Sequence, residues 1–380
     1  MKIFYWSPHI SDVATVYAVI NSAKSLKKYS HNKKPTIINA IGEWEDYREE
    51  LNKLNIEIID LLPFNFYKNL PRYSFLKSRL SYVFIFLISL FPLMHLIKKK
   101  KPEYLISHLI SSLPIFIFNV CNFKTKLILR ISGLPSLNFL RKNFWKISSN
   151  KIYKIFSPTI MTREKLINEK IFDEDKIFFL PDPIIEIKKF ISQKKENIEI
   201  NKDIKLIVAI GRLTKQKNFG FLVECFSKLE KKYEGENYQL IIIGEGEERV
   251  KIENNINLLK LENKVRLVGY QKNVYKFLKS ADCFILSSLW EDPGFVLMES
   301  AIIGTPIISS DCESGPRELI KENVNGFVFK SNDLENFLEI FELYKNIDIK
   351  KLKKIVLQAK LLAKKFTIFS HFKTLDNLLN

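Results

Sequence analysis

Short apolar segments of strand length alternate with longer helical stretches along both halves of the chain. In the first half the clearest of these segments are residues 2–6, 36–40, 104–107 and 126–131. In the second half they are residues 204–210, 240–243, 265–268, 283–288 and 306–309. Strands that are separated by helices pair in parallel, because each helix carries the chain back to the starting edge of the sheet. The pattern therefore predicts an α/β fold built on parallel sheets.

The length of the chain, 380 residues, exceeds what one hydrophobic core normally serves. Hydrophobic residues make up 46% of it, which is ordinary for a globular protein with large cores. After the run PDPIIEIKKF, residues 188–203 are polar and charged and show little apolar pattern. We therefore expect two domains with a boundary near residue 190.

Cysteine usage and the N-terminus bear on the compartment. The four cysteines, Cys121, Cys225, Cys283 and Cys312, lie far apart and form no CxxC pair. They fit buried, reduced thiols better than disulfides or a zinc site. The N-terminal run MKIFYWSPHI is too short for the apolar core of a signal peptide and indicates a first strand instead. We expect a cytoplasmic protein.

The segment EDPGFVLMES carries two carboxylates, Glu291 and Glu299, eight positions apart. It follows an apolar strand and opens an apolar helix, so Glu291 precedes the helix N-terminus and Glu299 lies inside the helix. Between them Gly294, Phe295 and Val296 offer backbone N–H groups that, with the helix dipole, suit a phosphate. A carboxylate can accept two hydrogen bonds from the vicinal hydroxyls of a sugar. The segment therefore suits a sugar attached to a phosphate.

A second candidate anion site lies upstream in GRLTKQKN, which follows the strand segment 204–210. Gly211 allows a tight turn from strand to helix, and Arg212 and Lys217 flank that turn. Two cations in this position can hold a diphosphate without a metal. Either residue alone would be interpreted as a solvated charge at the start of a helix, because the chain contains 60 Lys and Arg.

Seven motifs in a fixed order resemble a known family. They are GRLTKQKN, IIIGEGEE, VRLVGY, ADCFILSS, EDPGFVLMES, GTPIISSDCESGPREL and NGFVF, and they cover about a third of the chain. Together they resemble the donor-binding half of retaining glycosyltransferases of family 4, of the type that builds bacterial surface polysaccharides. The resemblance implies the GT-B fold, in which two Rossmann-like domains with parallel sheets face each other across an interdomain cleft.

The resemblance also implies the domain roles. Residues 1–190 would bind the acceptor, residues 191–355 would bind the nucleotide-sugar donor, and a helix over 356–380 would pack back on the first domain. By position in the motifs, Arg212 and Lys217 would hold the donor diphosphate, Glu291 the sugar hydroxyls and Glu299 the ribose. The remaining donor contacts would come from Gly211, Gly269, Tyr270, Gly294, Phe295 and Val296.

The implied activity is that of a hexosyltransferase. It would move a hexosyl unit from a nucleoside-diphosphate sugar to a saccharide or polyprenyl-diphosphate-linked saccharide with retention, in lipopolysaccharide, O-antigen or capsule synthesis. It would need no metal and no other cofactor. Two alternatives stay open: another GT-B enzyme such as a nucleotide-sugar epimerase, and a sugar-nucleotide-binding protein without catalysis. Product analysis without an acceptor separates them, since an epimerase would release an isomer or free sugar.

The first half departs from the family pattern in two loops. Residues 7–15, SPHISDVAT, contain no glycine where many members have a pair, which puts donor contact from this loop in doubt. Many members also have a histidine where RISGLPSLN places Ser132. His108 and Arg130, which follow or end predicted strands, are further candidates for the acceptor side.

Positive charge is concentrated in the first half. Residues 1–190 carry 30 Lys and Arg against 16 Asp and Glu, whereas residues 191–380 carry 30 against 26. A basic face attracts nucleic acid, an anionic membrane or an anionic substrate. No nucleic-acid-binding motif accompanies the charge, so we expect no nucleic-acid partner.

The segment 62–101 makes an anionic membrane a candidate partner, with the protein peripheral on the inner face of the cytoplasmic membrane. Its apolar run YVFIFLISLFPLMHLI is interrupted by Pro92 and followed by Lys98–Lys101. Sixteen residues are short for a span, which needs about 20. The interpretation we favour is a helix buried in the core of the first domain. The other is a monotopic anchor whose lysines meet anionic headgroups.

Other chemical motifs fail. Residues 173–175 form a DxD string, but it precedes a strand instead of following one and fits a solvated turn. Gly244 and Gly246 begin a GxG motif, yet Arg249 stands where a dinucleotide fingerprint needs its third glycine. No nucleophile elbow, HExxH motif or P-loop is present. Nicotinamide enzymes, hydrolases and kinases are disfavoured.

Overall fold

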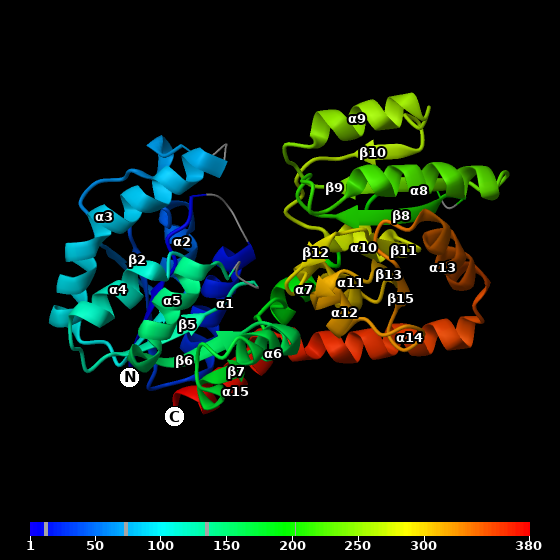
Figure 1. Cartoon of the computed structure of the whole chain (residues 1–380). Coiled ribbons are helices and arrows are strands. Elements are labelled where there is room, and N and C mark those ends of the chain that lie inside the picture. The colour runs from blue at the N-terminus through cyan, green and yellow to red at the C-terminus, as the bar shows by residue number, and fades with distance from the viewer. Residues whose placement is uncertain (11–13, 72–74, 134–136, 202) are drawn as a thin grey trace. The chain divides into compact units, whose positions relative to one another are not determined.

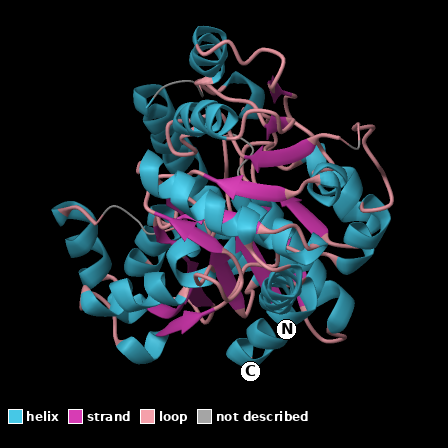
Figure 2. Cartoon of the chain, turned by 90° about the vertical axis from the view of Figure 1, so that its right-hand side faces the viewer, coloured by secondary structure: helices cyan, strands magenta, loops and turns pink. Residues whose placement is uncertain are grey.

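Figure 1 shows the computed structural model of the chain, which describes residues 1–10, 14–71, 75–133, 137–201 and 203–380. The chain divides into two compact units. Unit 1 comprises Met1–Ile184 together with Ile368–Asn380, and unit 2 comprises Ile185–Thr367. Each unit has a parallel sheet with helices on both of its faces (Figure 2).

The sheet of unit 1 has seven parallel strands in the order β3-β2-β1-β4-β5-β6-β7. The strands are β1 (Lys2–Trp6), β2 (Lys34–Asn39), β3 (Glu57–Asp60), β4 (Tyr104–Ser107), β5 (Lys126–Arg130), β6 (Ile152–Ser157) and β7 (Ile177–Phe179). The helices are α1 (Ala14–Tyr29), α2 (Glu45–Lys53), α3 (Phe75–Lys100), α4 (Ser112–Val120), α5 (Phe139–Ile147), α6 (Ile160–Asn168) and α15 (Ile368–Leu379). Short 3₁₀ turns lie at η1 (Tyr67–Asn69), η2 (Ser149–Lys151) and η3 (Glu174–Lys176).

Alternating side chains of the central strand β1 enter two different cores. Phe4 and Trp6 belong to the core that α3, α4 and α5 cover. Ile3 and Tyr5 belong to the core that α1, α2 and α15 cover. A strand sends successive side chains to opposite faces, so both faces of this sheet must be covered. This explains why the strand segments read as continuous apolar runs.

The main sheet of unit 2 has six parallel strands in the order β10-β9-β8-β11-β13-β15. They are β8 (Lys205–Ile210), β9 (Tyr238–Ile243), β10 (Val265–Leu267), β11 (Cys283–Leu286), β13 (Ile307–Ser310) and β15 (Phe327–Phe329). A small second sheet pairs β12 (Trp290–Glu291) with β14 (Glu313–Ser314). The helices are α7 (Ile187–Gln193), α8 (Phe219–Lys232), α9 (Arg249–Leu258), α10 (Tyr275–Ser280), α11 (Phe295–Ile303), α12 (Gly315–Leu319), α13 (Leu334–Asn346) and α14 (Ile349–Ala363), with a 3₁₀ turn at η4 (Lys364–Phe366).

In both units the strand order reverses next to the first strand, as in doubly wound Rossmann-like folds. The predicted α/β class with two parallel sheets is confirmed. β1 and β4 were predicted with their observed bounds, and the other predicted strands differ by one or two residues at an end. The prediction did not include β3, β6 or β15.

The units divide at different places from the predicted domains. The predicted boundary at 190 falls inside α7, a helix that packs on unit 2, where the rings of Phe190 and Tyr275 lie 5.2 Å apart. The predicted boundary at 355 falls inside α14, which packs on α11 of unit 2. Only the last helix, α15, returns to unit 1.

Helix α3 is only partly buried, contrary to the core interpretation that we favoured. Its buried face reaches the core through Ile85, Leu93 and Ile97. By length and composition its segment Ser78–Lys100 could cross a membrane, yet only 33% of its most apolar window is buried. Most of this apolar helix therefore faces outward.

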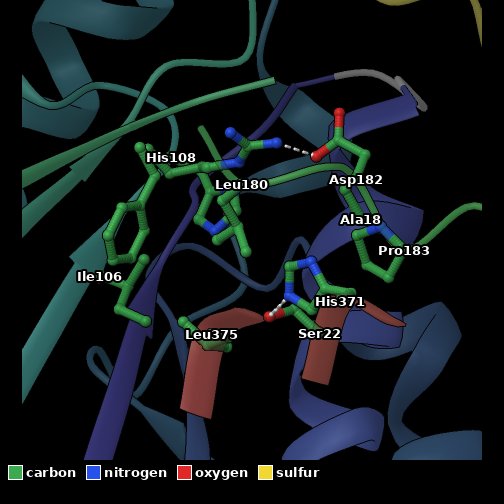
Figure 3. A pocket seen from close by; sticks show the side chains of 11 residues that line it. Ala18, Ser22, Ile106, His108, Leu180, Asp182, Pro183, His371 and Leu375 are labelled. Carbon is green, nitrogen blue, oxygen red and sulfur yellow. Dashed lines mark hydrogen bonds and ion pairs between the residues drawn. The ribbon is translucent and has the colours of Figure 1, made fainter. Parts of the chain in front are cut away.

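A chain of hydrogen bonds attaches α15 to the rest of unit 1. His371 donates from Nδ1 to the carbonyl oxygen of Pro181 at 2.7 Å, and its Nε2 lies 2.8 Å from Ser22 Oγ. Ser22 Oγ in turn lies 2.9 Å from the hydroxyl of Tyr5. Figure 3 shows His371 and Ser22 side by side in this buried region. Burial lowers the pKa of His371 to about 3, so the ring is neutral and accepts from Ser22.

We expect the packing of α15 to be necessary for the stability of unit 1. Leu375 is fully buried, so Leu375→Ala should cost about 2–5 kcal/mol and lower the melting temperature of unit 1 by about 5–15 °C. Tryptophan fluorescence follows this unit, because Trp6, Trp44 and Trp145 are buried in it and Trp290 of unit 2 is exposed. Asn377→Ala, at an exposed position of the same helix, is the matched control. Equal melting temperatures for both variants would contradict the role of α15.

Candidate active site

The predicted donor residues lie at the carboxyl edge of the sheet of unit 2. Arg212 and Lys217 follow β8, Tyr270 follows β10, and Glu291 follows β11. β8 and β11 are neighbours at the point where the strand order reverses. Loops diverge at such a point and leave room for a ligand beyond the strand ends. The fold therefore brings two of the predicted motifs together across one strand pair.

Lys217 and Glu291 form a buried ion pair across this junction. Lys217 Nζ donates to Glu291 Oε1, and the two side chains are only 12% and 7% exposed. Ser288 Oγ donates to the same carboxylate oxygen at 2.7 Å. The main chain also joins the two loops, since Ser287 Oγ donates to the carbonyl oxygen of Lys217 at 2.8 Å. These contacts hold both charges in fixed positions. Removal of one partner would leave the other charge buried without compensation.

Arg212 differs from Lys217 in its surroundings. Its side chain is exposed, and its guanidinium makes no hydrogen bond or ion pair with any residue that the structure describes. Gly211 beside it has a steric role: a Cβ there would lie 2.7 Å from Lys217 Cε. The absence of that Cβ lets the Lys217 side chain fold back over the loop toward Glu291. The site thus combines one positioned cation with one cation free to meet a ligand.

The N-terminus of α11 brings backbone N–H groups that have no acceptor within the helix into the same region. Gly294 caps the helix in the left-handed conformation, with φ of 86°, which favours glycine. The first N–H groups of a helix, here those of Phe295 and Val296, have no acceptor within the helix. Glu291 lies next to this cap, because a Cβ on Gly294 would lie 3.5 Å from the Glu291 Cβ. A phosphate or a sugar oxygen at this position would meet positive dipole and carboxylate together.

A third loop, 310–315, supports the first two, and the sequence argument gave it no role. Ser310 Oγ donates to the carbonyl oxygen of Ser288 at 2.7 Å. Gly315 lies so close to Pro293 that a Cβ would stand 1.9 Å from its carbonyl oxygen. The paired serines that end β11 and β13, in ADCFILSS and PIISS, were a usable signal, because hydroxyls at strand ends hold neighbouring loops.

Glu299 lies inside α11, half-buried, and has no hydrogen-bond partner among the described residues. Burial raises the pKa of Glu299 to about 7, and the nearby cations Lys189 and Lys217 lower it by a smaller amount. A carboxylate at this position gains from a bound hydroxyl, which would replace lost water. The predicted ribose contact is compatible with this environment, and it stays a prediction.

Gly269 and Tyr270 border the site on the far side of β9. Gly269 has a φ of 73° and accepts a hydrogen bond from Gly244 N–H at 2.9 Å. Gly244 itself leaves no room for a side chain, because a Cβ would lie 1.9 Å from the carbonyl oxygen of Gly211. Tyr270 is 68% exposed. The GxG motif, which failed as a dinucleotide fingerprint, therefore packs the loops together at this edge.

The three acceptor-side candidates line one cavity of unit 1. His108, Arg130 and Ser132 follow or end β4 and β5 and border a cavity of about 670 Å³, together with Trp145 and Tyr82. Arg130 is ion-paired with Asp182, and one of its terminal nitrogens, Nη1, is buried without a hydrogen-bond partner in the described residues. Burial lowers the pKa of His108, and Arg130 adds to this effect, so the imidazole is neutral. Figure 3 shows His108 and Asp182 at a neighbouring pocket of about 10 Å³, roughly the space of one water.

Four predicted features fall partly outside the described residues. The residues that are not described are positions 11–13 of the loop 7–15, 72–74 of the segment 62–101, 134–136 of RISGLPSLN and 202 of the polar stretch 188–203. The DxD string lies at the turn η3, where the side chains of Asp173 and Glu174 are 72% and 68% exposed. This agrees with the predicted solvated turn.

The two Rossmann-like units define a GT-B fold, and the comparisons with known proteins agree. A glycosyltransferase from Rickettsia africae of solved structure matches with a TM-score of 0.77 at 18% identity, over 100% of this chain and 97% of that one. Residues 190–361 match the family model described as glycosyl transferases group 1. These residues therefore match that family, and the resemblance of the seven motifs to those of a GT-B glycosyltransferase is confirmed.

Two curated relatives extend the match beyond unit 2. An uncharacterised glycosyltransferase of Methanocaldococcus jannaschii is 33% identical over 271 residues, which is 66% of this chain and 65% of the relative. An Escherichia coli enzyme, UDP-Gal:alpha-D-GlcNAc-diphosphoundecaprenol alpha-1,3-galactosyltransferase, is 26% identical over 276 residues, 66% of this chain and 68% of the relative. The chain spans less than two thirds of the length of the first of these relatives, so its own reaction is a matter for proposal.

Glu299 should make the stability of unit 2 depend on pH. Its pKa is about 7 in the folded protein, against an ordinary value of 4.5, so the folded state binds the proton more tightly. Folding stability should therefore fall as pH rises from about 4.5 to 7, by about 1–3 kcal/mol relative to Glu299→Gln, which does not titrate. Unfolding at several pH values, followed by circular dichroism, measures the difference. Parallel stability curves for the two proteins would show that Glu299 is not desolvated.

Proposed function

We propose that this chain transfers a hexosyl unit from a nucleoside-diphosphate sugar to a hydroxyl of a saccharide or polyprenyl-diphosphate-linked saccharide, with retention of configuration. The observation that carries the proposal is the buried Lys217–Glu291 pair where the strand order reverses, beside the free guanidinium of Arg212 and the N-terminus of α11. This arrangement offers hydrogen-bond acceptors to a sugar and positive charge to a diphosphate. We place the reaction in the synthesis of a bacterial surface polysaccharide such as lipopolysaccharide, O-antigen or capsule.

In the reaction the bond between the anomeric carbon and the diphosphate oxygen breaks, and the acceptor oxygen forms the new bond on the same face of the sugar. Negative charge grows on the leaving diphosphate, whose oxygen takes the proton of the acceptor hydroxyl. Lys217 and the N–H groups of Phe295 and Val296 stabilise that charge from fixed positions, and the free guanidinium of Arg212 moves onto the diphosphate to add a further positive charge. Lys217 has three N–H bonds, so it can stay bound to Glu291 while it donates to a phosphate.

Glu291 has two tasks in this scheme. Its Oε1 accepts from Lys217 and Ser288, which leaves Oε2 as the acceptor for a sugar hydroxyl. Because these contacts fix the carboxylate, the sugar is oriented by a group that does not need to reorganise. Two cations and a helix dipole meet the diphosphate, so we propose that catalysis requires no divalent ion and no cofactor.

The acceptor site that we propose is the 670 Å³ cavity of unit 1. Its volume is within the usual range for small-molecule sites. Polar groups from His108, Arg130 and Ser132 line it together with the aromatic ring of Trp145, a combination that suits the hydroxyls and the apolar face of a sugar. The name of the Escherichia coli relative specifies a diphosphoundecaprenol-linked acceptor. We propose the same chemical class here and place the reaction on the cytoplasmic side of the membrane, in line with four free cysteines.

Loss of either member of the buried pair should abolish transfer. Lys217→Met and Glu291→Gln should each lower turnover by about 100- to 1000-fold, since each group supplies about 3–4 kcal/mol at the transition state. The double variant Lys217→Met/Glu291→Gln restores charge balance and should fold stably without regaining activity. Lys215→Ala, an exposed lysine two positions away, is the matched control and should stay within twofold of wild type.

The assay begins with a thermal-shift panel of UDP, GDP, ADP and their sugars, which identifies the donor by the stability that it adds. Transfer is then measured in excess EDTA, and the anomeric configuration of the product is read by NMR. Inversion, a strict need for a divalent ion, or near-normal turnover in both single variants would each refute the corresponding part of the proposal. An isomerised donor formed without acceptor would identify an epimerase instead.

Filling the cavity of unit 1 should separate acceptor use from donor binding. Ser132→Trp places an indole in the cavity and should lower transfer by about 100-fold, because the acceptor loses its position. Donor affinity, measured by calorimetry, should stay within twofold, since the donor residues belong to unit 2. The control is Lys124→Trp, an exposed position before β5 and therefore at the other end of the same strand. Full transfer activity in Ser132→Trp would rule out this cavity.

A further inference from the structure

Helix α3 turns a row of large apolar residues outward, while two of its serines lie on its buried face. Ser81 and Ser89 are 1% and 0% exposed on the buried face, and Ser81 Oγ donates to the carbonyl oxygen of Pro71 at 2.9 Å. The outward residues are Leu80, Val83, Leu87 and Phe91, which are 67%, 56%, 62% and 70% exposed. Their spacing of three and four positions puts them on one side of the helix. Water selects polar residues for the outward side of a surface helix, so this exposed apolar row is unusual.

The exposed apolar surface continues beyond α3. The ring of Phe84 packs edge-on against Phe66 at 5.6 Å, and Phe64, 67% exposed, lies beside Phe66. On the neighbouring helix α4, Phe116 packs against Phe86 at 5.9 Å and is itself 38% exposed. We call this surface the α3 face, defined by Phe64, Leu80, Val83, Leu87, Phe91 and Phe116. A contiguous surface of this kind marks a binding site for a protein or a membrane.

Positive charge stands at both ends of the α3 face. Arg79 is exposed at its start, and Lys98, Lys99, Lys100 and Lys101 are exposed at its end. None of these four lysines forms an ion pair with a residue that the structure describes. The apolar stretch between Leu80 and Phe91 is about 16 Å long at the rise of an α-helix. The surface is therefore apolar in the middle and cationic at its ends.

We propose that the α3 face lies in the interface of an anionic lipid bilayer, with its apolar side chains among the acyl chains and its lysines on the headgroups. Apolar residues with flanking cations are what such an interface binds, and each lysine near the surface contributes. The helix lies in the plane of the membrane and does not cross it, because its other face is packed in the core of unit 1 through Ile85, Leu93 and Ile97.

A second copy of the chain is a poorer occupant for this surface. A twofold axis would set the two copies of α3 either antiparallel, so that the lysines of one meet Arg79 of the other, or parallel, so that the lysines of both lie together. Like charges would then face each other at both ends of the contact. A bilayer that contains anionic lipids neutralises the same charges.

The proposed acceptor cavity is bordered by α3. Tyr82 of α3 and Leu140 of α5 both line the cavity, and Leu140 is 76% exposed. If the proposed function holds, a lipid-linked acceptor would reach the cavity from the bilayer without leaving it. The membrane proposal does not depend on that function, since it concerns lipid binding alone.

The test is sedimentation of the full chain with vesicles of phosphatidylcholine, either alone or mixed with phosphatidylglycerol. The wild type should bind the anionic vesicles, and binding should weaken as salt rises. Leu87→Glu/Phe91→Glu should lower the vesicle partition by at least about tenfold, because two apolar side chains no longer insert. The matched control is Val250→Glu/Leu258→Glu on α9 of unit 2, where the side chains are 68% and 81% exposed. This control should bind as the wild type does.

A charge variant tests the cationic ends separately. Lys98→Gln/Lys99→Gln/Lys100→Gln should lower binding to anionic vesicles by about 100-fold, at about one order of magnitude or less for each lysine. The control, Lys350→Gln/Lys353→Gln/Lys354→Gln on α14, removes the same charge from another exposed basic helix. An equal loss in this control, or in the α9 control, would overturn the assignment to α3.

Three further outcomes would also overturn the proposal. They are failure of the wild type to bind anionic vesicles, resistance of the bound wild type to carbonate extraction, as a spanning helix would show, and a wild-type dimer that Leu87→Glu/Phe91→Glu dissociates in analytical ultracentrifugation. Circular dichroism and tryptophan fluorescence establish that each variant is folded. Because no readout involves sugar transfer, an inactive enzyme would leave this test unaffected.

Discussion

The ion pair between Lys217 and Glu291 fixes the geometry on which the candidate site depends. It joins the loops after β8 and β11, the two strands at which the order of the sheet reverses, and it is almost completely shielded from water. A pair of this kind adds little stability over well-packed apolar residues, yet the loss of one partner is costly. The ion pair therefore matters for the position of its two charged groups and not for stability. With Ser288 on the same carboxylate oxygen, the pair holds an acid and a cation at set places before any ligand arrives. Arg212, by contrast, has no partner among the described residues and can adjust to a bound anion.

Close backbone approach is the second constraint, and glycines make it possible. Gly244 and Gly315 each touch the carbonyl oxygen of another loop at a distance that excludes any side chain. These contacts tie the loops after β8 and β9 to each other and the loop after β13 to the start of α11. The site is therefore held by main-chain packing as well as by charge, and side chains are left free to face a ligand. Preorganisation of this kind lowers the cost of charge reorganisation during transfer.

The sequence predicted the fold class well, and it showed that the candidate donor motifs follow strands, because both features depend on local patterns. Strands β1 and β4 are buried apolar runs with clear ends, and the donor motifs stand directly after strands. Two errors have physical causes. The polar stretch after residue 187 was taken to mark a domain boundary near residue 190, but Phe190 packs on Tyr275 and the side chain of Asn273 donates to the carbonyl oxygen of Gln193, so α7 is held on unit 2. In the stretch 82–97 of α3 nearly every residue is apolar, so periodicity could not separate its faces, and Ser89 within this stretch is buried. Only the structure shows which face of α3 is exposed.

The path of the chain gives unit 1 a dependence that unit 2 lacks. Unit 2 is one continuous segment, Ile185–Thr367, and its two ends lie side by side, since Ile185 N–H donates to the carbonyl oxygen of Phe366 at 2.9 Å. Unit 1 needs both ends of the chain. Lys33 bonds to Asp376 at 2.5 Å, and His371 completes the buried hydrogen-bond chain through Ser22 to Tyr5. During synthesis unit 1 cannot bury Ser22 and Leu375 until the last helix has been made, whereas unit 2 is already complete. The neutral histidine in α15 is suited to this closing role, because it satisfies a carbonyl oxygen and a hydroxyl at once and brings no charge into the core.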